Sequence, residues 1–442
     1  MRRAFGQTTA VWYLLFQASQ FHVLYYASRT LSNMFAFGMS TLAMRALLPG
    51  PTISSDKHRT QYRLSLGLLT VAGIVFRSEL ALFLATHTLF LLGTGRVGLR
   101  RDIIPAGILG LLIGLGLTVP IDSFFWQDFP LWPELAAFKF NVVHGQSSAW
   151  GTQPWHFYLS NAIPRLLMNP CTYLLAIPLA LAQPSTRTAA TYLLTPSAAF
   201  VLLFSLQPHK EWRFILYVVP SLTAAAALGA TYVWTHRAKS LAYRAVSWAM
   251  LLSPLATFGL STFVLLPSSA ANYPGAYALR ALHNHHQDAD TPPNSDISVY
   301  LGNLACQTGV TRFQQQPPPT WRYDKTENES EKATSAFWAR FDYALVEVDG
   351  PDEAAIFQFQ SQSPGQSWEE VEIVYGFAGL RVLRPGREAG VSVERGALEV
   401  VGGERVVGLF ESGRELVRKV VTRGWWAELG MQPRVRVLRR VG

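Results

Sequence analysis

Long apolar stretches recur through the first 267 residues, and they constrain the fold more than any other feature of the chain. A helix needs about 20 predominantly apolar residues to cross the hydrocarbon core of a bilayer. Several stretches approach this length, and short polar segments separate them. We therefore predict a mainly α, polytopic membrane protein with spans at residues 10–27, 31–48, 62–76, 80–93, 103–120, 170–184, 189–206, 212–234 and 241–267.

The distribution of charge gives the predicted bundle an orientation. The chain has a net charge of +9, but only 15% of its residues are charged. The positive-inside rule places short basic loops in the cytosol; here they are 49–63, 93–102, 184–187 and 235–244. The polar segment at 208–213 and the C-terminal region then lie on the opposite side. No nucleic-acid-recognition motif accompanies the basic residues, so we expect no nucleic-acid partner.

Composition changes along the chain predict three parts. Residues 1–267 form the transmembrane bundle, with an aromatic, Pro-interrupted luminal loop at 121–169. Alternating apolar and polar residues in DISVYLGNL and DYALVEVD predict strands, so 268–385 is expected to be a smaller luminal α+β domain. Residues 386–442 are expected to be a charged, Gly-rich C-terminal tail.

The segment PHKEWRFILYVVP, residues 208–220, places His209, Lys210, Glu211 and Arg213 between two apolar runs. Charged groups are costly inside a bilayer, so such a cluster lies at a membrane edge or around a site. A helix that starts here would attract a phosphate group through its free N–H groups and its dipole. A lipid phosphate is therefore one candidate ligand. Snorkelling residues that anchor the helix at the interface are the alternative.

Three other groups of residues are candidates for a polar site. Arg29 either binds phosphate or caps the preceding helix, and Arg77 with Glu79 fits a structural ion pair within the bundle. Aromatic side chains stack on sugar rings, so the segment Trp150–Gly151 and Trp155 could form a sugar platform; interface anchoring by Trp is the alternative.

A metal site is not expected from this sequence. His283, His285 and His286 lie close together, but they belong to a polar, loop-like stretch. No Cys-rich zinc spacing, Ser-His-Asp set or Gly-rich phosphate loop appears in the sequence. We therefore expect neither a metal nor another cofactor.

The residues His209 to Phe214 resemble a specific motif. They match the His-Lys-Glu-x-Arg-Phe hallmark of the lumen-facing mannosyltransferases of glycosyltransferase family 22, which use dolichyl-phosphate-mannose. Segments that follow residue 266 resemble the alpha-1,6-linking members more than the alpha-1,2-linking ones. The supporting segments are SQFHVLYYASRTLSN (19–33), FRSELALF (76–83), DSFFWQDFPLWPE (122–134), SSAWGTQPWHFY (147–158), NAIPR (161–165), NYPG (272–275), QTGVTRF (307–313) and WRYDKTE (321–327).

The resemblance implies a fold, an activity and partners. The fold would be a C-type glycosyltransferase-like helix bundle followed by a smaller α+β luminal domain. The activity would be inverting transfer of mannose, in alpha-1,6 linkage, from dolichyl-phosphate-mannose to a dolichyl-pyrophosphate-linked oligosaccharide. The enzyme would be multi-pass in the bilayer of the endoplasmic reticulum, with its active face in the lumen. An alpha-1,2-mannosyltransferase of the same family is the alternative.

The resemblance also implies roles for residues. His209, Lys210, Arg213 and Arg29 would surround the donor phosphate. The sugar cleft would be lined by Trp150, Gly151 and Trp155.

One part of the family pattern has no counterpart in this sequence. The resemblance begins after the family's first membrane helix and the acidic luminal loop that carries its catalytic base. We therefore expect that the chain lacks its N-terminal part, and that it would be inactive as written. A non-catalytic fragment is the alternative reading, and Glu211 and Asp122 are the luminal carboxylates left as fallback bases.

Overall fold

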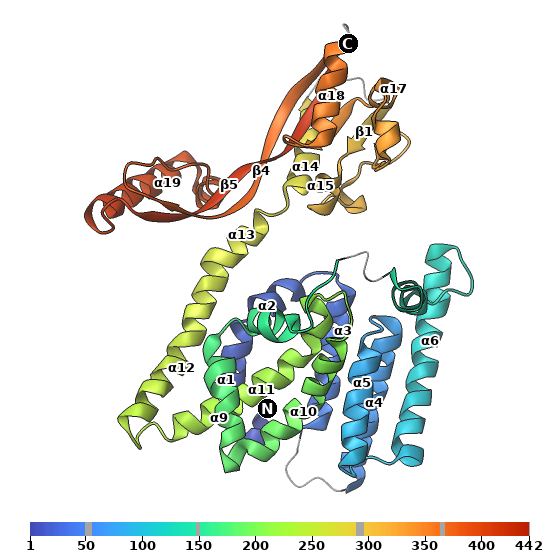
Figure 1. Cartoon of the computed structure of the whole chain (residues 1–442), viewed down its shortest axis with the longest axis vertical. Coiled ribbons are helices and arrows are strands. Elements are labelled where there is room, and N and C mark those ends of the chain that lie inside the picture. Colours follow the sequence, from blue (N-terminus) through green and yellow to red (C-terminus); the bar gives the residue numbers. More distant parts are fainter. Residues whose placement is uncertain (49–54, 147–150, 289–295, 363–366, 442) are drawn as a thin grey trace. The chain divides into compact units, whose positions relative to one another are not determined.

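The computed structural model describes residues 1–48, 55–146, 151–288, 296–362 and 367–441. The chain forms two compact units, Met1–Ser261 and Thr262–Gly442 (Figure 1). The regular elements described in the first unit are all helices, and the second unit contains a β-sheet. The division into a helical part and a smaller α+β part follows from where the long apolar stretches stop.

The first unit is a bundle of helices of very different lengths. Its α-helices are α1 (Arg2–Ala18), α2 (Phe21–Ala27), α3 (Ser32–Leu47), α4 (Ser55–Val75), α5 (Leu80–Gly93), α6 (Ile104–Trp126), α7 (Pro133–Phe138), α8 (Ile163–Leu167), α9 (Ile177–Ala182), α10 (Pro184–Phe204), α11 (Val219–Thr235) and α12 (Leu241–Leu260). Short π or 3₁₀ segments adjoin them: η1 (Leu99–Ile103), η2 (Lys139–Val143), η4 (Tyr158–Ala162), η5 (Thr172–Ala176) and η6 (Trp212–Val218).

Four described helical segments are long and apolar enough to cross a membrane: Leu99–Trp126, Pro184–Phe204, Trp212–Thr235 and Leu241–Ala270. The pair Tyr158–Leu167 and Thr172–Ala182, bent by 115°, would make a fifth if it forms one broken span. On α6 the buried positions are small residues such as Gly110 and Gly114, whereas Leu109 and Leu112 are exposed. An exposed apolar face of this kind is suited to lipid, as expected for a multi-pass membrane protein.

Helix α11 is the core of the bundle, and small residues allow its neighbours to approach closely. Ala225, Ala226 and Ala227 are fully buried. At Gly229, a Cβ atom would lie 1.9 Å from the carbonyl oxygen of Ala176. The backbone of α11 therefore touches the backbone of η5, and only glycine fits at this contact.

Gly229→Leu is expected to prevent folding of the bundle, and Gly229→Ala to lower its thermal midpoint, because even one methyl group must push α11 away from η5. Overpacking of a tight core costs about 1–3 kcal/mol or more. Fluorescence-detected size exclusion after heating measures the effect. Gly259→Ala is the matched control, since a Cβ atom there meets nothing within 4 Å. An unchanged midpoint for Gly229→Ala would contradict the packing described here.

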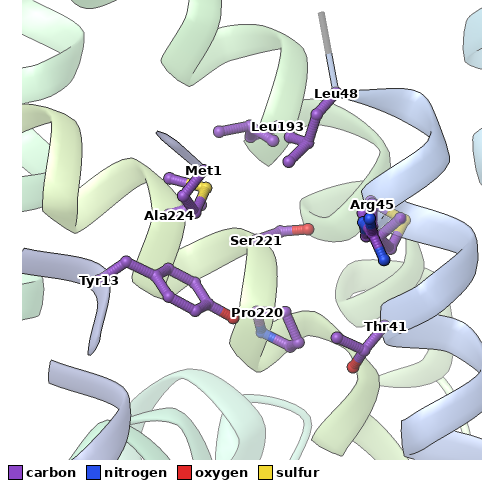
Figure 2. A pocket seen from close by; sticks show the side chains of 10 residues that line it. Met1, Tyr13, Thr41, Arg45, Leu48, Leu193, Pro220, Ser221 and Ala224 are labelled. Atoms are coloured by element: carbon purple, nitrogen blue, oxygen red, sulfur yellow. The ribbon is translucent and has the colours of Figure 1, made fainter. Parts of the chain in front are cut away.

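The first unit also contains a mostly apolar cavity of about 190 Å³, lined by side chains from α1, α3, α10 and α11 (Figure 2). Arg45 and the Ser221 hydroxyl are among its few polar groups, and Leu48, Leu193 and Ala224 are part of its apolar wall. A cavity with such a wall offers water few partners and is suited to an apolar chain.

The second unit is built around a five-stranded sheet with the order β2-β1-β3-β5-β4. Strands β1, β2 and β3 are parallel, whereas β5 is antiparallel to both β3 and β4. The strands are β1 (Ile297–Leu301), β2 (Trp321–Asp324), β3 (Tyr343–Glu347), β4 (Ser367–Leu383) and β5 (Trp426–Val441). The helices are α13 (Leu266–Ala270), α14 (Pro274–Asp288), α15 (Asn303–Gln307), α16 (Glu329–Lys332), α17 (Ser335–Trp338), α18 (Pro351–Gln362) and α19 (Val393–Val420), with the short segments η7 (Ser261–Leu265) and η8 (Arg312–Gln314).

Alternate residues of the strands build two cores. Val299 of β1 packs in one cluster with Leu279 and Leu282 of α14. The next residue, Tyr300, packs in another cluster with Trp338 of α17 and Ile356 of α18. Successive side chains of a strand point to opposite faces, so the sheet lies between these two groups of helices.

The C-terminal residues contribute a strand to this sheet. Strand β5 lies between β3 and β4, and its pairing with β4 runs from Ser367 opposite Val441 to Leu383 opposite Trp426. Only Val435–Arg439 of β5 also pairs with β3, so the far half of the β4–β5 hairpin extends beyond the sheet. Helix α19 lies beside this extension (Figure 1).

Candidate functional site

The turn between α10 and η6 carries the polar residues of segment 208–213. The Nδ1 atom of His209 lies 2.9 Å from the carbonyl oxygen of Gly151, and its Nε2 atom lies 3.2 Å from Oε1 of Glu211. A carbonyl and an ionised carboxylate only accept hydrogen bonds. The imidazole can therefore donate to both partners only when each ring nitrogen carries a proton.

Lys210 joins this turn to a second stretch of main chain. Its side chain is 5% exposed, and its ammonium donates to the carbonyl oxygens of Gln153, at 2.9 Å, and Gln207. The N–H of Gln153 in turn donates to the carbonyl oxygen of Pro208 at 3.0 Å. Burial lowers the pKa of Lys210. The ammonium thus holds loop 151–155 against the turn, and one of its three N–H groups remains for another acceptor.

Glu211 and Arg213 form a two-point ion pair. NH2 of Arg213 lies 2.8 Å from Oε1 of Glu211, and Nε lies 2.5 Å from Oε2. Burial opposes ionisation of Glu211, but Arg213 and His209 outweigh burial, and the pKa of Glu211 is lowered. A carboxylate with a lowered pKa is a weaker proton acceptor. The same pairing fixes the plane of the Arg213 guanidinium. The NH1 group of Arg213 is not part of this ion pair.

Glu79 is the centre of a second polar cluster, immediately before α5. Its Oε1 atom accepts hydrogen bonds from Nε of Arg77 at 2.9 Å, from the hydroxyl of Tyr217 at 3.0 Å and from Nδ2 of Asn33 at 3.2 Å. The Glu79 side chain is 7% exposed. Its contacts join α3, the turn between α4 and α5, and η6 at one carboxylate.

Glu134, on the first turn of α7, lies beside this cluster. Its Oε2 atom accepts a hydrogen bond from the main-chain N–H of Ser78 at 2.6 Å. Burial raises the pKa of Glu134, and the nearby charge of Glu79 acts in the same direction, although Arg77 opposes it. The luminal loop expected at 121–169 is therefore tied to the end of α4 at this point.

Phe214 brings the two clusters together. The guanidinium carbon of Arg77 lies 5.7 Å from the centre of the Phe214 ring, and that of Arg213 lies 5.9 Å from it. The His209 ring is 5.8 Å from the same ring. Three cationic or protonatable groups, distant in sequence, thus surround one aromatic side chain. Within the described residues, the terminal nitrogens of Arg77 have no protein acceptor.

Arg29 lies two residues after the end of α2, whose Tyr26 contacts this neighbourhood. The Tyr26 ring lies 5.1 Å from the ring of Trp212, which starts η6. The guanidinium carbon of Arg29 lies 4.8 Å from the centre of the neighbouring Tyr25 ring. NH2 of Arg29 also donates to the hydroxyl of Tyr25 at 2.7 Å.

The remaining predicted site residues are placed differently. Gly151, with φ of 93°, contacts His209, but Trp150 lies outside the described residues. Trp155 is 67% exposed, and its described ring contact is with His156. Asp122 accepts a hydrogen bond from Thr118, one turn earlier on α6. The structure therefore brings Gly151 next to the turn, whereas the described contacts of Trp155 and Asp122 are local.

Some residues of this site were not singled out by sequence reasoning. Asn33 and Glu134 end two of the segments that carried the resemblance, and Tyr217 is a hydroxyl inside an apolar run. A polar atom within an apolar run is the signal that could have identified Tyr217, because a buried polar group needs a partner. Among the residues that the structure describes, no group of three or more His, Cys, Asp or Glu side chains is placed to hold a metal ion.

Comparison with known proteins supplies the context for this site. Residues 1–314 match the model of the Alg9-like mannosyltransferase family. The chain is 36% identical over 351 residues to a probable Dol-P-Man:Man(7)GlcNAc(2)-PP-Dol alpha-1,6-mannosyltransferase of Schizosaccharomyces pombe, covering 78% of this chain and 59% of that protein. A Drosophila melanogaster protein of the corresponding name is 35% identical over 349 residues, with 78% and 47% covered. The chain thus spans about half to three fifths of the length of these relatives.

A solved structure shows the same fold. ArnT from Cupriavidus metallidurans, bound to undecaprenyl phosphate, has a TM-score of 0.51 at 16% identity, covering 84% of this chain and 78% of that one. This likeness confirms the fold class expected from the sequence, a C-type glycosyltransferase-like helix bundle followed by a smaller α+β part.

Proposed function

Because the chain belongs to the Alg9-like mannosyltransferase family, we propose that it transfers mannose from dolichyl-phosphate-mannose to Man(7)GlcNAc(2)-PP-Dol in alpha-1,6 linkage. Two relatives whose names state this reaction support the linkage and both substrates. The reaction belongs to the assembly of the lipid-linked precursor of N-glycans.

The observation that carries the proposal is the convergence of Arg77, His209 and Arg213 on Phe214. The donor carries a phosphodiester that must be held at the membrane surface and becomes a phosphomonoester when mannose leaves. Guanidinium groups bind phosphate oxygens in pairs and keep their charge at every physiological pH. Arg29, which bonds to Tyr25, is proposed as a further guanidinium of this site, because the adjacent Tyr26 contacts Trp212 at the start of η6.

The chemical role proposed for Arg77, His209 and Arg213 is to stabilise the negative charge that develops on the departing phosphate. As the bond between the sugar and the phosphate oxygen breaks, negative charge grows on the phosphate. Preorganised cations that stabilise this charge lower the barrier. Glu211 holds Arg213 in one orientation through its two contacts, and Glu79 holds Arg77 through Nε. Both carboxylates therefore act as positioning groups for the arginines.

Loop 151–155 is the proposed sugar-binding side of the site. Its Gly151 carbonyl contacts His209, and its Gln153 carbonyl contacts Lys210, so the loop lies directly against the phosphate-binding turn. The contiguity of the two segments fits a substrate in which sugar and phosphate are bonded to one another. Lys210 positions the loop and offers its third N–H group to the phosphate.

The charge pattern supports a luminal location for the proposed reaction. The chain is a multi-pass membrane protein, and its short basic loops are expected in the cytosol. The turn at 207–211 then faces the opposite side, which would be the lumen of the endoplasmic reticulum. Tagging the C-terminus with a glycosylation acceptor tests this orientation together with the activity.

A transfer assay tests the proposed reaction. Membranes from cells that express the chain would receive labelled dolichyl-phosphate-mannose and the acceptor with seven mannoses. The assay compares the chain as written with a version that also carries the family's acidic luminal loop. We expect one labelled mannose in alpha-1,6 linkage from the extended version, as shown by digestion with linkage-specific mannosidases, and little transfer from the chain as written. An alpha-1,2 product would favour the alternative linkage. Donor binding, measured by protection from heat with dolichyl phosphate, in the absence of transfer would favour the non-catalytic reading.

A further inference from the structure

A second cavity, which is polar, lies at the other end of α4, away from the candidate site. It has a volume of about 590 Å³, and its wall includes His58, Arg59, Tyr62, Arg96, Arg101 and Asp102. Arg59 lies 16 residues before the end of α4, which places it roughly 24 Å along the helix from Val75. Helices α4, α5 and α6 lie side by side in the first unit (Figure 1), and the loop between α5 and α6 forms one wall.

The single acidic group among the wall residues is already neutralised. Oδ1 of Asp102 accepts hydrogen bonds from Nε of Arg59 at 2.6 Å and Nε of Arg63 at 2.8 Å. Its Oδ2 atom accepts from the N–H of Gly98 at 2.9 Å. Asp102 is 4% exposed. It therefore orients the guanidinium groups of Arg59 and Arg63 and does not add an unpaired negative charge to the cavity.

Two further arginines leave the cavity positively charged. The Arg96 guanidinium lies 4.2 Å from the centre of the Tyr192 ring, and its NH1 group donates to the Tyr62 hydroxyl at 3.2 Å. Among the residues that the structure describes, Arg96 is thus held in place without a carboxylate partner. The Arg101 side chain is exposed, and within the described part of the chain it has no ion pair.

The position of the cavity defines which anions can reach it. The membrane-spanning segment that contains α6 begins at Leu99, so the wall residues 95–98, Arg101 and Asp102 lie where this helix enters the bilayer. The N-terminal end of this helical segment adds a partial positive charge. Basic pockets at this depth, on the cytosolic side, are suited to lipid head groups.

We propose that this cavity binds a phosphomonoester at the membrane face opposite the candidate site. Several arginines around one cavity favour a doubly charged phosphate over a phosphodiester, because guanidinium groups form charge-assisted, paired hydrogen bonds to its oxygens. The group could be a lipid head group or a soluble phosphate ester, which have the same charged end. The binding is independent of mannosyl transfer.

Phosphatidic acid and glycerol 3-phosphate distinguish the two sources. The purified full chain, in neutral detergent, would be titrated with phosphatidic acid, with phosphatidylglycerol, with phosphatidylcholine and with glycerol 3-phosphate, and its thermal midpoint would be followed by Trp fluorescence. We expect phosphatidic acid to raise the midpoint at concentrations at least tenfold lower than phosphatidylglycerol. An equal response to glycerol 3-phosphate assigns a soluble ester as the ligand, and a response to phosphatidic acid alone assigns a lipid.

Arg101→Gln and Arg100→Gln form a matched pair of variants. Both residues are exposed and adjacent, and both changes remove one charge, but only Arg101 lines the cavity. We expect Arg101→Gln to weaken phosphatidic acid binding about tenfold, Arg101→Glu to weaken it further, and Arg100→Gln to change it less than twofold. The midpoints of the unliganded variants report folding. Equal losses in Arg100→Gln and Arg101→Gln, or equal responses to phosphatidic acid and phosphatidylcholine, overturn the proposal.

Discussion

Glu79→Ala is expected to destabilise the protein by about 3–5 kcal/mol, the range for removing one partner of a buried ion pair. The change leaves three donors without their shared acceptor: Nε of Arg77, the hydroxyl of Tyr217 and Nδ2 of Asn33. The cost is large because the Glu79 side chain is 7% exposed, so water cannot easily replace it. Thermal unfolding in detergent, followed by size exclusion, measures the loss.

Two further variants separate charge from hydrogen bonding at Glu79. Glu79→Gln keeps one acceptor oxygen but removes the charge, so it should lose less stability than the alanine variant. The double variant Arg77→Ala/Glu79→Ala removes the unpaired guanidinium and should be more stable than Glu79→Ala alone. If the three variants have one common midpoint equal to that of the unmodified chain, then Glu79 does not join α3, the turn before α5 and η6 as described.

In a version of the chain that also carries the family's acidic luminal loop, Arg213→Ala is expected to lower mannosyl transfer by about 10²–10³-fold, the range seen when one preorganised donor to a developing charge is removed. Its effect on stability should be small. The side chains of Arg213 and Glu211 are 41% and 30% exposed, and ion pairs with this exposure typically contribute about 0–1 kcal/mol. The assay with dolichyl-phosphate-mannose gives the rate, and thermal unfolding gives the stability.

Two further variants accompany this experiment. Arg213→Lys separates the charge of Arg213 from its geometry, and Arg322→Ala is a control. Lysine keeps the charge at 213 but cannot reproduce the two-point contact with Glu211, so partial activity is expected. Arg322 pairs with Asp296 in the second unit with 71% of its side chain exposed, and its removal should leave transfer unchanged. Transfer by Arg213→Ala at the rate of the extended version with Arg213 in place would remove Arg213 from the phosphate site.

Part of the bundle could be predicted, because a long apolar run gives a local signal. The run at 212–234 corresponds to the helical segment Trp212–Thr235, and the run at 241–267 corresponds to Leu241–Ala270. The length of a run and the charges at its ends are properties of neighbouring residues. They therefore indicate a helix without any knowledge of what packs against it.

The contacts within the site could not be predicted in the same way, because they join distant segments. The sequence shows Arg77 and Glu79 as neighbours, but the hydroxyl that completes the cluster belongs to Tyr217, 138 residues further on. The sequence predicts Lys210 as a phosphate ligand. In the structure its ammonium donates to two main-chain carbonyls. Loop 151–155 packs against the turn that carries Lys210. No residue pattern within either segment indicates that the two segments contact each other.

The C-terminal residues illustrate the limit for strands. Alternation in VRVLRR indicates a strand near residue 435, but pairing is set by partners more than 50 residues away. The charged and Gly-rich residues 386–425 give no signal of helix α19, which lies between β4 and this strand in the sequence. The place of β5 between β3 and β4 is likewise not indicated by local alternation.

The three hydrogen bonds between loop 151–155 and the turn at 207–211 have a consequence for how substrates arrive and leave. Since His209, Lys210 and Pro208 each bond to the loop, the loop cannot move away from the turn without breaking these bonds. In the proposed site, a sugar that displaced the loop would therefore also disturb the cations expected to bind the phosphate. Release of the sugar end of the donor would then be coupled to release of its phosphate end.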